Sequence, residues 1–233
     1  MWYPENKRIL NTQLTKFVGR KRGKKINGII VPHAAYLYSG AIAGSAFAYL
    51  KGKKYKKAVI LGPSHYVHLY EAATSNRKKW STPLGNIDLF NKDFPTADIR
   101  REHSITNQIP FLQKLGFEEI MPLMVGQITN EKAEEIAKQL AKLKNTVLIF
   151  STDLSHFLPH EVATQKDKHS IKLIEDLNFQ NFKQIDACGI YPLLILFHLC
   201  KLKKTKPKLI QYKNSGDITK DHSAVVGYAS FYF

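Results

Sequence analysis

The sequence is poor in cysteine and in acidic side chains, and it lacks an apolar run as long as a membrane span. Its two cysteines show no CxxC spacing, which excludes a disulfide framework and indicates a reducing compartment, the cytoplasm. The most apolar segment, residues 190–200, is shorter than the roughly 20 residues that a transmembrane helix needs. No basic start followed by an apolar run marks a signal peptide. We therefore expect a cytoplasmic protein without a membrane partner.

Acidic side chains are outnumbered by basic ones, 19 against 35, which gives a formal charge of +16. The basic residues cluster at residues 20–25, 51–57 and 201–208. Such a field attracts polyanions. The clusters are mostly lysine without interleaved aromatics, and no nucleic-acid-binding motif accompanies them. A solvated basic surface is the simpler interpretation, and specific recognition of nucleic acid is not expected.

Three apolar segments end immediately before polar side chains. Strands are predicted at residues 25–31, 55–61 and 146–150, where β-branched residues suit strands buried on both faces. The polar side chains that follow them are His33, His65, Asp153 and His156. A single histidine after a strand often only fills a loop. Three such strand ends predict one rim at the carboxyl edge of a parallel sheet, where ligands bind.

The remaining patterns favour one α/β domain with a mixed sheet. Residues 1–24 are interpreted as an N-terminal arm with a basic loop. Ser39 is the predicted N-cap of a helix over residues 39–50, whose glycine and alanine content predicts close packing against the sheet. The helix and its flanking strands form a βαβ unit.

The middle of the chain predicts a sheet extension. Two strands at residues 71–75 and 85–90 are expected to form a hairpin or to extend the sheet, and a helix is expected over residues 104–115. Pro122 lies in a predicted strand over residues 119–125, which favours an edge or a bulge. Further helices are predicted near residues 130–140, 160–177 and 188–202, and strands at 209–213 and 224–233.

Two imidazoles and a carboxylate are a donor set for Fe(II), Cu or Zn that leaves positions open for substrate. His33 and His65 would supply the imidazoles. The carboxylate could come from Asp153 or from the late loop at residues 214–222, where Asp217 could equally be a turn former.

Two further pairs suit proton transfer. Asp153 and His156 share one short loop, and Glu102 precedes His103. A carboxylate can orient an imidazole that moves protons, although Asp153 could instead cap a helical turn.

Three tyrosines flank the predicted metal histidines. Tyr36, Tyr38 and Tyr66 could line a substrate pocket together with Glu102, or they could simply cover the sheet edge. Cys188 precedes Gly189 at a predicted helix start, where either a packing role or a lowered pKa is possible.

The motifs together resemble those of the Memo family, whose prokaryotic members are often named AmmeMemoRadiSam system protein B. The similar blocks follow the family order from about residue 25 onward and cover nearly the whole chain. They are PHAAYLYSG at 32–40, LGPSH at 61–65, EHSI at 102–105, QIPFLQ at 108–113, PLMVG at 122–126, STDLSH at 151–156, DACG at 186–189, YKNSGD at 212–217 and VVGYA at 225–229.

This resemblance implies a three-layer α/β/α sandwich related to the LigB-type class III extradiol dioxygenases, formed by residues 1–233 as one domain. It implies that His33 and His65 bind a metal ion, non-haem Fe(II) first and Cu or Zn otherwise. It also implies that Asp153 and His156 line the same pocket. The third ligand of the human relative is a cysteine in the late loop, where the nearest candidate here is Asp217. Ala35 and Thr106 depart from the family pattern of Gly and Glu.

The function expected from the residues and the resemblance is that of a metal-dependent redox enzyme with an unidentified small-molecule substrate. In this expectation Asp153, His156 and His103 are the catalytic residues. Two alternatives stay open. One is a binding module for phosphorylated peptides or other anionic partners, and the other is a component that works with a radical-SAM partner protein.

Overall fold

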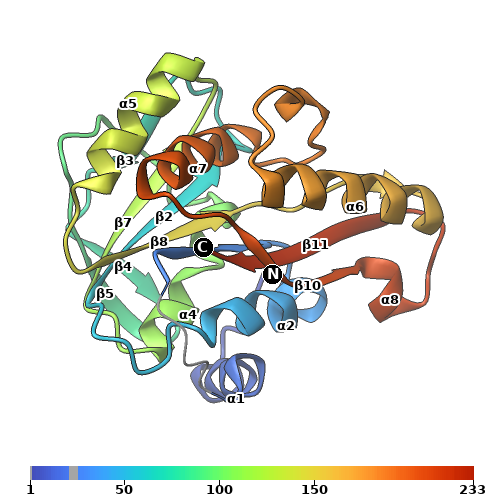
Figure 1. The fold of residues 1–233 in the computed structure, drawn as a ribbon. Helices are drawn as coiled ribbons and strands as arrows, with labels where there is room; N and C mark the ends of the chain where they lie inside the picture. The colour runs from blue at the N-terminus through green and yellow to red at the C-terminus, as the bar shows by residue number, and fades with distance from the viewer. Residues whose placement is uncertain (1, 21–25) are drawn as a thin grey trace.

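The computed structural model describes residues 2–20 and 26–233, and its centre is a mixed β-sheet (Figure 1). Four neighbouring strands of this sheet run parallel to one another. In their order across the sheet they are β1 (Gly28–Val31), β8 (Thr146–Ser151), β2 (Lys57–Pro63) and β7 (Glu119–Val125). This arrangement confirms the predicted α/β class. The part of the first strand expected at residue 25, and most of the basic cluster at 20–25, lie outside the described residues.

Strands of mixed direction extend the sheet on both sides. On one side β11 runs antiparallel to both β1 and β10, and β9 pairs with β11. On the other side β3 runs antiparallel to β7 and parallel to β6, and β5 pairs with β4 and β7. Their bounds are β3 Ala72–Ser75, β4 Lys79–Thr82, β5 Gly85–Leu89, β6 Thr96–Ala97, β9 His156–Leu158, β10 Lys208–Asn214 and β11 Val225–Tyr232.

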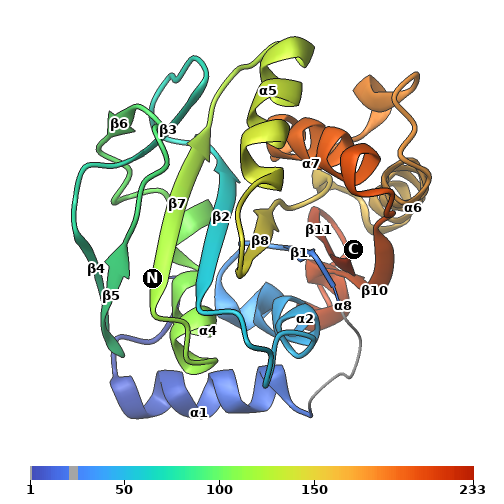
Figure 2. The same cartoon turned by 60° about the vertical axis from the view of Figure 1, so that its left-hand side comes forward.

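Helices cover both faces of the sheet (Figure 2), as the three-layer prediction requires. Side chains alternate along the central strands: Ile30 packs into one hydrophobic core, whereas Ile29 packs into the other. The first core takes in α5, α6 and α7, and the second takes in α1, α2 and α4. The helices are α1 Lys7–Val18, α2 Tyr36–Phe47, α3 His103–Thr106, α4 Ile109–Lys114, α5 Asn130–Ala141, α6 His160–Asp176, α7 Ile190–Lys203 and α8 Ser215–Thr219, with a 3₁₀ turn at Phe182–Gln184.

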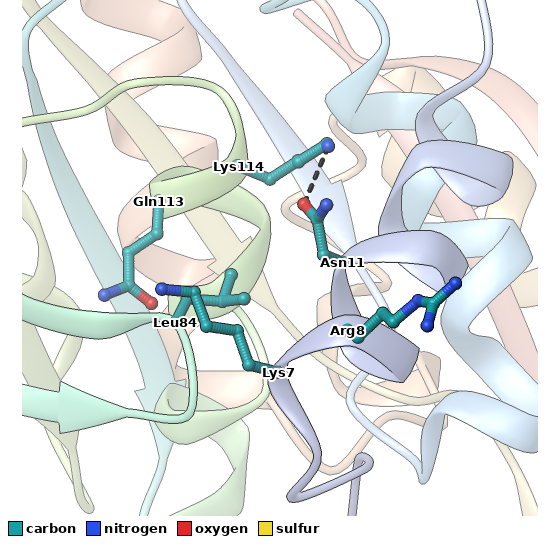
Figure 3. A pocket seen from close by; sticks show the side chains of 6 residues that line it. All are labelled: Lys7, Arg8, Asn11, Leu84, Gln113 and Lys114. Atoms are coloured by element: carbon teal, nitrogen blue, oxygen red, sulfur yellow. Dashed lines mark hydrogen bonds between the residues drawn. The ribbon is translucent and has the colours of Figure 1, made fainter.

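The N-terminal segment is a packed helix of 12 residues, where the sequence predicts an arm with one amphipathic turn. Asn6 caps α1 by accepting hydrogen bonds from the backbone of Arg8 and Ile9. Leu10 and Leu14 are fully buried against the second core. Next to this buried face, Lys114 Nζ of α4 donates to Asn11 Oδ1 at 2.8 Å (Figure 3). Among the described residues, no helix combines the length and apolarity that a bilayer crossing would need.

The small residues of α2 let α1 approach closely. The helix begins at Tyr36, before the predicted N-cap at Ser39, whose hydroxyl instead donates to the carbonyl of Ala34. A Cβ atom on Gly44 would lie 2.5 Å from the backbone carbonyl of Phe17, and one on Gly40 would lie 2.5 Å from the Phe17 ring. These two glycines therefore face a second helix, while α2 also packs against β1, β10 and β11, as predicted.

We expect Gly44→Ala to lower the free energy of unfolding by about 1–3 kcal/mol, the usual cost of overpacking. The loss should occur even though alanine is the better helix former by about 1 kcal/mol. Urea denaturation measures it. Ala41→Ser, on the exposed side of the same helix, is the control and should change stability by less than about 0.5 kcal/mol. Equal stability of Gly44→Ala and wild type would contradict the close contact.

Pro122 is tolerated in β7, inside the sheet, because the strand that pairs with one edge of β7 changes at this residue. β5 pairs with β7 at Glu119 and Ile120, and β3 pairs with β7 from Leu123 onward. Pro122 falls between the two segments, so no ladder donor is required there. The strands predicted at residues 71–75 and 85–90 extend the sheet, because β3 and β5 both pair with β7, and the hairpin partner of β5 is β4. The single helix expected over residues 104–115 is divided into α3 and α4.

Candidate metal centre

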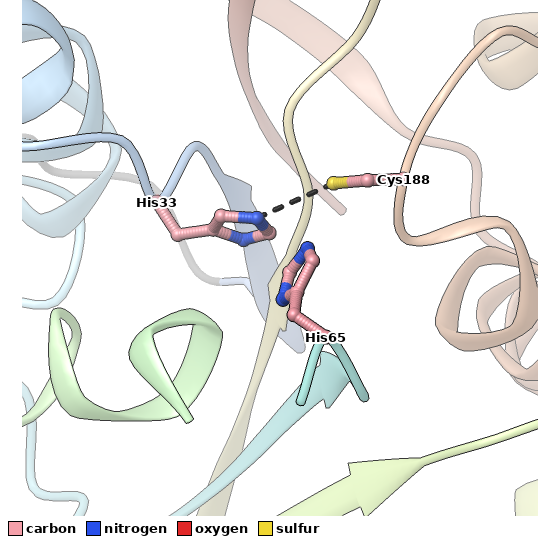
Figure 4. Close-up of side chains that lie close together, drawn as sticks. All are labelled: His33, His65 and Cys188. Carbon is pink, nitrogen blue, oxygen red and sulfur yellow. Dashed lines mark hydrogen bonds between the residues drawn. The ribbon is translucent and has the colours of Figure 1, made fainter. Parts of the chain in front are cut away.

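The carboxyl ends of the parallel strands bring two histidines and a cysteine together (Figure 4). His33 follows β1, His65 follows β2, and Cys188 precedes α7. Their ligand-type atoms lie within 4.8 Å of one another, and Cys188 Sγ is 3.3 Å from His33 Nε2. The two imidazole rings are 5.1 Å apart and nearly perpendicular. Of the four side chains predicted to converge on one rim, His33, His65 and Asp153 lie together, whereas His156 is exposed and affects the cluster through its charge.

His33 is held by two direct contacts, and a third hydrogen bond fixes one of its partners. Its backbone N–H donates to Asp153 Oδ1 at 2.7 Å, and its Nδ1 lies 3.0 Å from Ser151 Oγ. Gln108 Nε2 donates to the same hydroxyl at 3.1 Å. Burial of His33, reinforced by the neighbouring histidines, holds its pKa well below the usual value. The neutral ring is thus fixed with Nε2 directed at Cys188, which is the form that binds metal ions.

His65 is held by one buried carboxylate. Glu102 accepts from the backbone N–H of His65 at 2.7 Å, and its other oxygen lies 2.8 Å from His65 Nδ1. Glu102 also caps α3 by accepting from Ser104 N. Burial of Glu102 acts to raise its pKa, but the hydrogen bonds from His65 and Ser104 outweigh burial and leave the pKa lowered. The carboxylate therefore stays ionised and leaves Nε2 of His65 available for a ligand.

Cys188 was predicted only as a packing or reactive thiol, and the structure places it beside the two imidazoles. Its Sγ accepts a hydrogen bond from Asp153 N at 3.2 Å, and the adjacent Gly189 packs directly on Thr152. Burial, followed by the charge of Asp153, raises the pKa of the thiol to about 12. A lowered pKa from the helix start is therefore wrong for the protein without a metal ion. The sequence carries no signal that places Cys188 beside the two histidines, because that placement depends on how α7 packs against the end of β8.

Asp217 has a different partner from the one that the sequence suggested. Its carboxylate accepts from Asn214 N at 2.8 Å, and the Asn214 side chain accepts from Asp217 N, which closes a capping box on α8. Asp217 belongs to neither of the ligand-type clusters found in residues 2–20 and 26–233. The third ligand-type group next to His33 and His65 is the Cys188 thiol, and the late loop uses Asp217 to begin a helix.

The carboxylate of Asp153 serves His33 and not His156. Asp153 is buried, and burial raises its pKa to about 7, although the hydrogen bond from His33 N opposes that rise. His156 begins β9 and is exposed. In the part of the chain that the structure describes, Asp153 makes no hydrogen bond to the His156 side chain. The proposed orientation of His156 by Asp153 is therefore not seen, because β9 turns toward β11.

His103 lies against the same cluster from the side of α3. Its ring centroid is 4.3 Å from that of His65 and 5.2 Å from that of His33. On the opposite face it stacks on Trp2 at 4.2 Å with an interplanar angle of 6°. Burial, and then the charge of His65, lowers the pKa of His103 to about 4. His65, Glu102 and His103 form a second group of ligand-type atoms within 4.8 Å.

The three tyrosines predicted to line a substrate pocket lie in different surroundings. Tyr36 is buried, and its hydroxyl donates to the carbonyl of Asn107, whose side chain donates to the carbonyl of His33. Tyr36 therefore supports the His33 loop from within the core. Tyr38 lines a separate cavity of about 290 Å³. Tyr66 is 55% exposed and lies 5.5 Å from His103, so it is the tyrosine at the mouth of the cluster.

A small cavity opens beside Cys188. It measures about 230 Å³ and lies between the loop after β2 and the start of α7. Its polar lining includes His68 and Gln127, and Tyr191 of α7 contributes an aromatic wall. This volume lies below the roughly 300–1,000 Å³ of drug-sized ligand sites. The cavity is therefore suited to a small molecule.

The donor set fits a first-row transition metal ion. Each imidazole is held through Nδ1 by a polar partner, Ser151 for His33 and Glu102 for His65, so that Nε2 is the nitrogen left to face a metal ion, and His33 Nε2 lies 3.3 Å from Cys188 Sγ. This is the usual arrangement of metal-binding histidines, whose second nitrogen is anchored by an outer partner. A thiol becomes a thiolate when it binds such an ion. The three groups His33, His65 and Cys188 could hold one ion and leave further positions open.

The sheet order and the cluster define an α/β protein with a candidate metal centre at the carboxyl edge of its parallel strands. The family model described as Memo-like protein matches residues 1–232, and the chain belongs to the Memo family. A MEMO1 family protein of Sulfurisphaera tokodaii is 34% identical over 88% of this chain and 81% of its own length. Similar proteins from Nitrosopumilus maritimus and Aquifex aeolicus are 30% and 31% identical, each over all of this chain and 96% of their own length.

Proposed function

We propose that this protein is a metal-dependent redox enzyme that acts on a small molecule, with one ion held by His33, His65 and Cys188. The observation that carries the proposal is the paired orientation of the imidazoles. The ligand-type nitrogens of both lie within 4.8 Å of the Cys188 thiol, and both rings are fixed through Nδ1 by partners of their own. The cavity of about 230 Å³ shares Cys188 with this site, and it would hold a small substrate next to the thiol.

The donor set guides the choice of metal. The donor set expected from the sequence, two imidazoles and a carboxylate, is typical of non-haem Fe(II). The donor set seen in the structure has a thiol in place of the carboxylate, and a thiolate ligand favours copper or zinc. A bound iron or copper ion would supply one-electron chemistry at the substrate. We therefore propose to test Fe(II) and copper first. Zinc would also fit these donors, but a zinc site would have no redox chemistry.

The protein residues around the ion would have distinct tasks in this proposal. Asp153 positions His33 through the backbone N–H, and Glu102 holds the proton on His65 Nδ1. His156 lies close enough for its charge to affect the pKa of His33, and we propose that it transfers a proton to or from the substrate. Tyr66 stands at the exposed mouth of the cluster, where it could contact the substrate.

The experiment loads protein purified without air with Fe(II) or with copper, and measures oxygen uptake with a panel of small aromatic diols. Uptake that requires both the metal and an intact Cys188 supports the proposal. Cys200→Ser is the control for Cys188→Ser, because Cys200 is buried within α7 away from the imidazoles. If Cys188→Ser takes up oxygen as fast as wild type, the thiol is not part of the metal site. The absence of stable metal binding would overturn the proposal itself.

A second candidate function is anion binding in a groove between α1 and α4. This cavity of about 600 Å³ is lined by three basic side chains and by no acidic one (Figure 3). The basic residues are Lys7, Arg8 and Lys114. Lys7 and Arg8 lie in the first turn of α1, which has no acidic residue, so they add to the positive end of the helix dipole. A phosphorylated peptide would suit this charge, and its binding by metal-free protein would support an adaptor role.

We expect binding to a random-sequence DNA duplex to be independent of sequence and to weaken steeply with salt. Each phosphate contact contributes about −0.9 to the slope of log K against log salt, because counterions are released. Fluorescence anisotropy at several salt concentrations measures the slope. The double variant Lys7→Glu with Arg8→Glu should lower the affinity and flatten the slope. A sequence preference that persists at high salt would contradict this interpretation of the basic surface.

A further inference from the structure

We propose that His65, Glu102 and His103 form a second cation site, which shares His65 with the site formed by His33, His65 and Cys188. The inference goes beyond the proposed redox function, and it does not require an ion in the first site. The second site would take a divalent first-row ion such as Zn²⁺ or Co²⁺, because its donors are two imidazoles and one carboxylate.

The three donors face one another around a single carboxylate oxygen. Glu102 Oε1 lies 2.8 Å from His65 Nδ1 and 3.5 Å from His103 Nδ1. The other oxygen, Oε2, accepts from the backbone N–H of His65 at 2.7 Å. The carboxylate is 2% exposed and belongs to the N-cap of α3. Its orientation is therefore fixed by the backbone, and Oε1 stays directed at the two rings.

His103 has a nitrogen that the protein does not satisfy. Within the described residues, His103 Nδ1 is buried and has no hydrogen-bond partner, since 3.5 Å to Glu102 is too long for a good hydrogen bond. Buried polar nitrogens are nearly always paired, and an unpaired one calls for a specific explanation. Stacking on Trp2 holds the ring in this position without a polar contact. A cation between Glu102 and His103 would supply the missing partner.

A cation can enter this group with little rearrangement. It would replace the proton that His65 Nδ1 shares with Glu102, while Oε1 keeps the hydrogen bond from Ser104 N at 3.0 Å. When both sites are filled, His65 binds one ion through each nitrogen, and its ring proton leaves to solvent. The side chain of His65 is 27% exposed, and Tyr66 beside it is exposed, so an ion can reach the group from outside.

Titration of metal-stripped protein with Co²⁺ under anaerobic conditions tests the proposal. We expect two equivalents to bind wild type and one to bind His103→Phe, since phenylalanine keeps a flat ring against Trp2 but has no nitrogen. Cys188→Ala should also bind one equivalent, and that equivalent should depend on His103. His169→Phe is the matched control, because His169 is exposed and pairs with Gln184; it should bind two.

Absorption of Co²⁺ separates the two sites. An ion next to Cys188 gives a thiolate charge-transfer band, and an ion at Glu102 and His103 does not. If wild type shows no thiolate band but keeps the equivalent that depends on His103, then the proposed redox site fails and this inference stands. If wild type binds one equivalent with a thiolate band and His103→Phe binds the same, then the inference is overturned.

Glu102→Gln gives an independent second variant in case the aromatic substitution at His103 destabilises the fold. Glutamine has one oxygen, which can accept from Ser104 N or from His65 N but not from both, and it lacks the charge that a cation needs. We expect this variant to lose the second equivalent of Co²⁺. Zn²⁺ should raise the melting temperature of Cys188→Ala through the second site alone, and Glu102→Gln should lose that part of the rise. Retention of both by folded Glu102→Gln would overturn the proposal.

Discussion

Replacing His33 by alanine is expected to remove tightly bound Fe(II) or copper from the protein. The substitution deletes one of three ligands, and the remaining His65 and Cys188 are too few for tight chelation. Loss of an outer hydrogen-bonding partner alone costs about 10–100-fold in metal affinity, and loss of the ligand itself should cost more than that. His65→Ala should have the same effect. Elemental analysis after anaerobic purification measures the metal content.

The control for these variants is His169→Ala, an exposed histidine on α6 outside both ligand-type clusters. It should retain the metal content of wild type. Circular dichroism must show that His33→Ala is folded, because His33 is buried and anchors Asp153. Folded His33→Ala and His65→Ala proteins that both keep their metal would contradict the site.

Replacing His156 by alanine is expected to leave the metal bound and to lower turnover by about 10²–10⁴-fold, the usual contribution of general acid–base catalysis. Two observations separate His156 from the ligands. It is exposed at the start of β9, and it belongs to neither cluster of ligand-type atoms in the described chain. Metal analysis and oxygen uptake with the most active diol of the panel measure the two properties on the same preparation.

Asp153→Asn separates orientation from proton transfer. Asparagine retains an oxygen that can accept from His33 N, so we expect a smaller loss of turnover than for His156→Ala. The two effects should add, because Asp153 does not bond to the His156 ring. The opposite metal result would reverse the roles: if His156→Ala strips the metal and His33→Ala does not, then His156 is a ligand.

The sequence determined the central strands and the rim that they form. Apolar β-branched segments predicted β1, β2 and β8, and the residues just after them are His33, His65 and Asp153. Parallel strands place their carboxyl ends at one edge, so these three positions could be predicted to converge without any coordinates. The motif blocks indicated the Memo family because each is a short stretch of residues that is visible in the sequence itself.

Only the tertiary structure decided which side chains meet at that rim. Cys188 is 155 residues from His33 along the chain, and it reaches His33 because α7 packs over the end of β8. Asp217 was equally plausible as a ligand, but its carboxylate is used locally to cap α8. Local sequence patterns carry strand and helix periodicity, whereas contacts between distant segments depend on how the layers pack. The pairing of Asp153 with His33, and the close approach of α1 to Gly44, were decided by that packing in the same way.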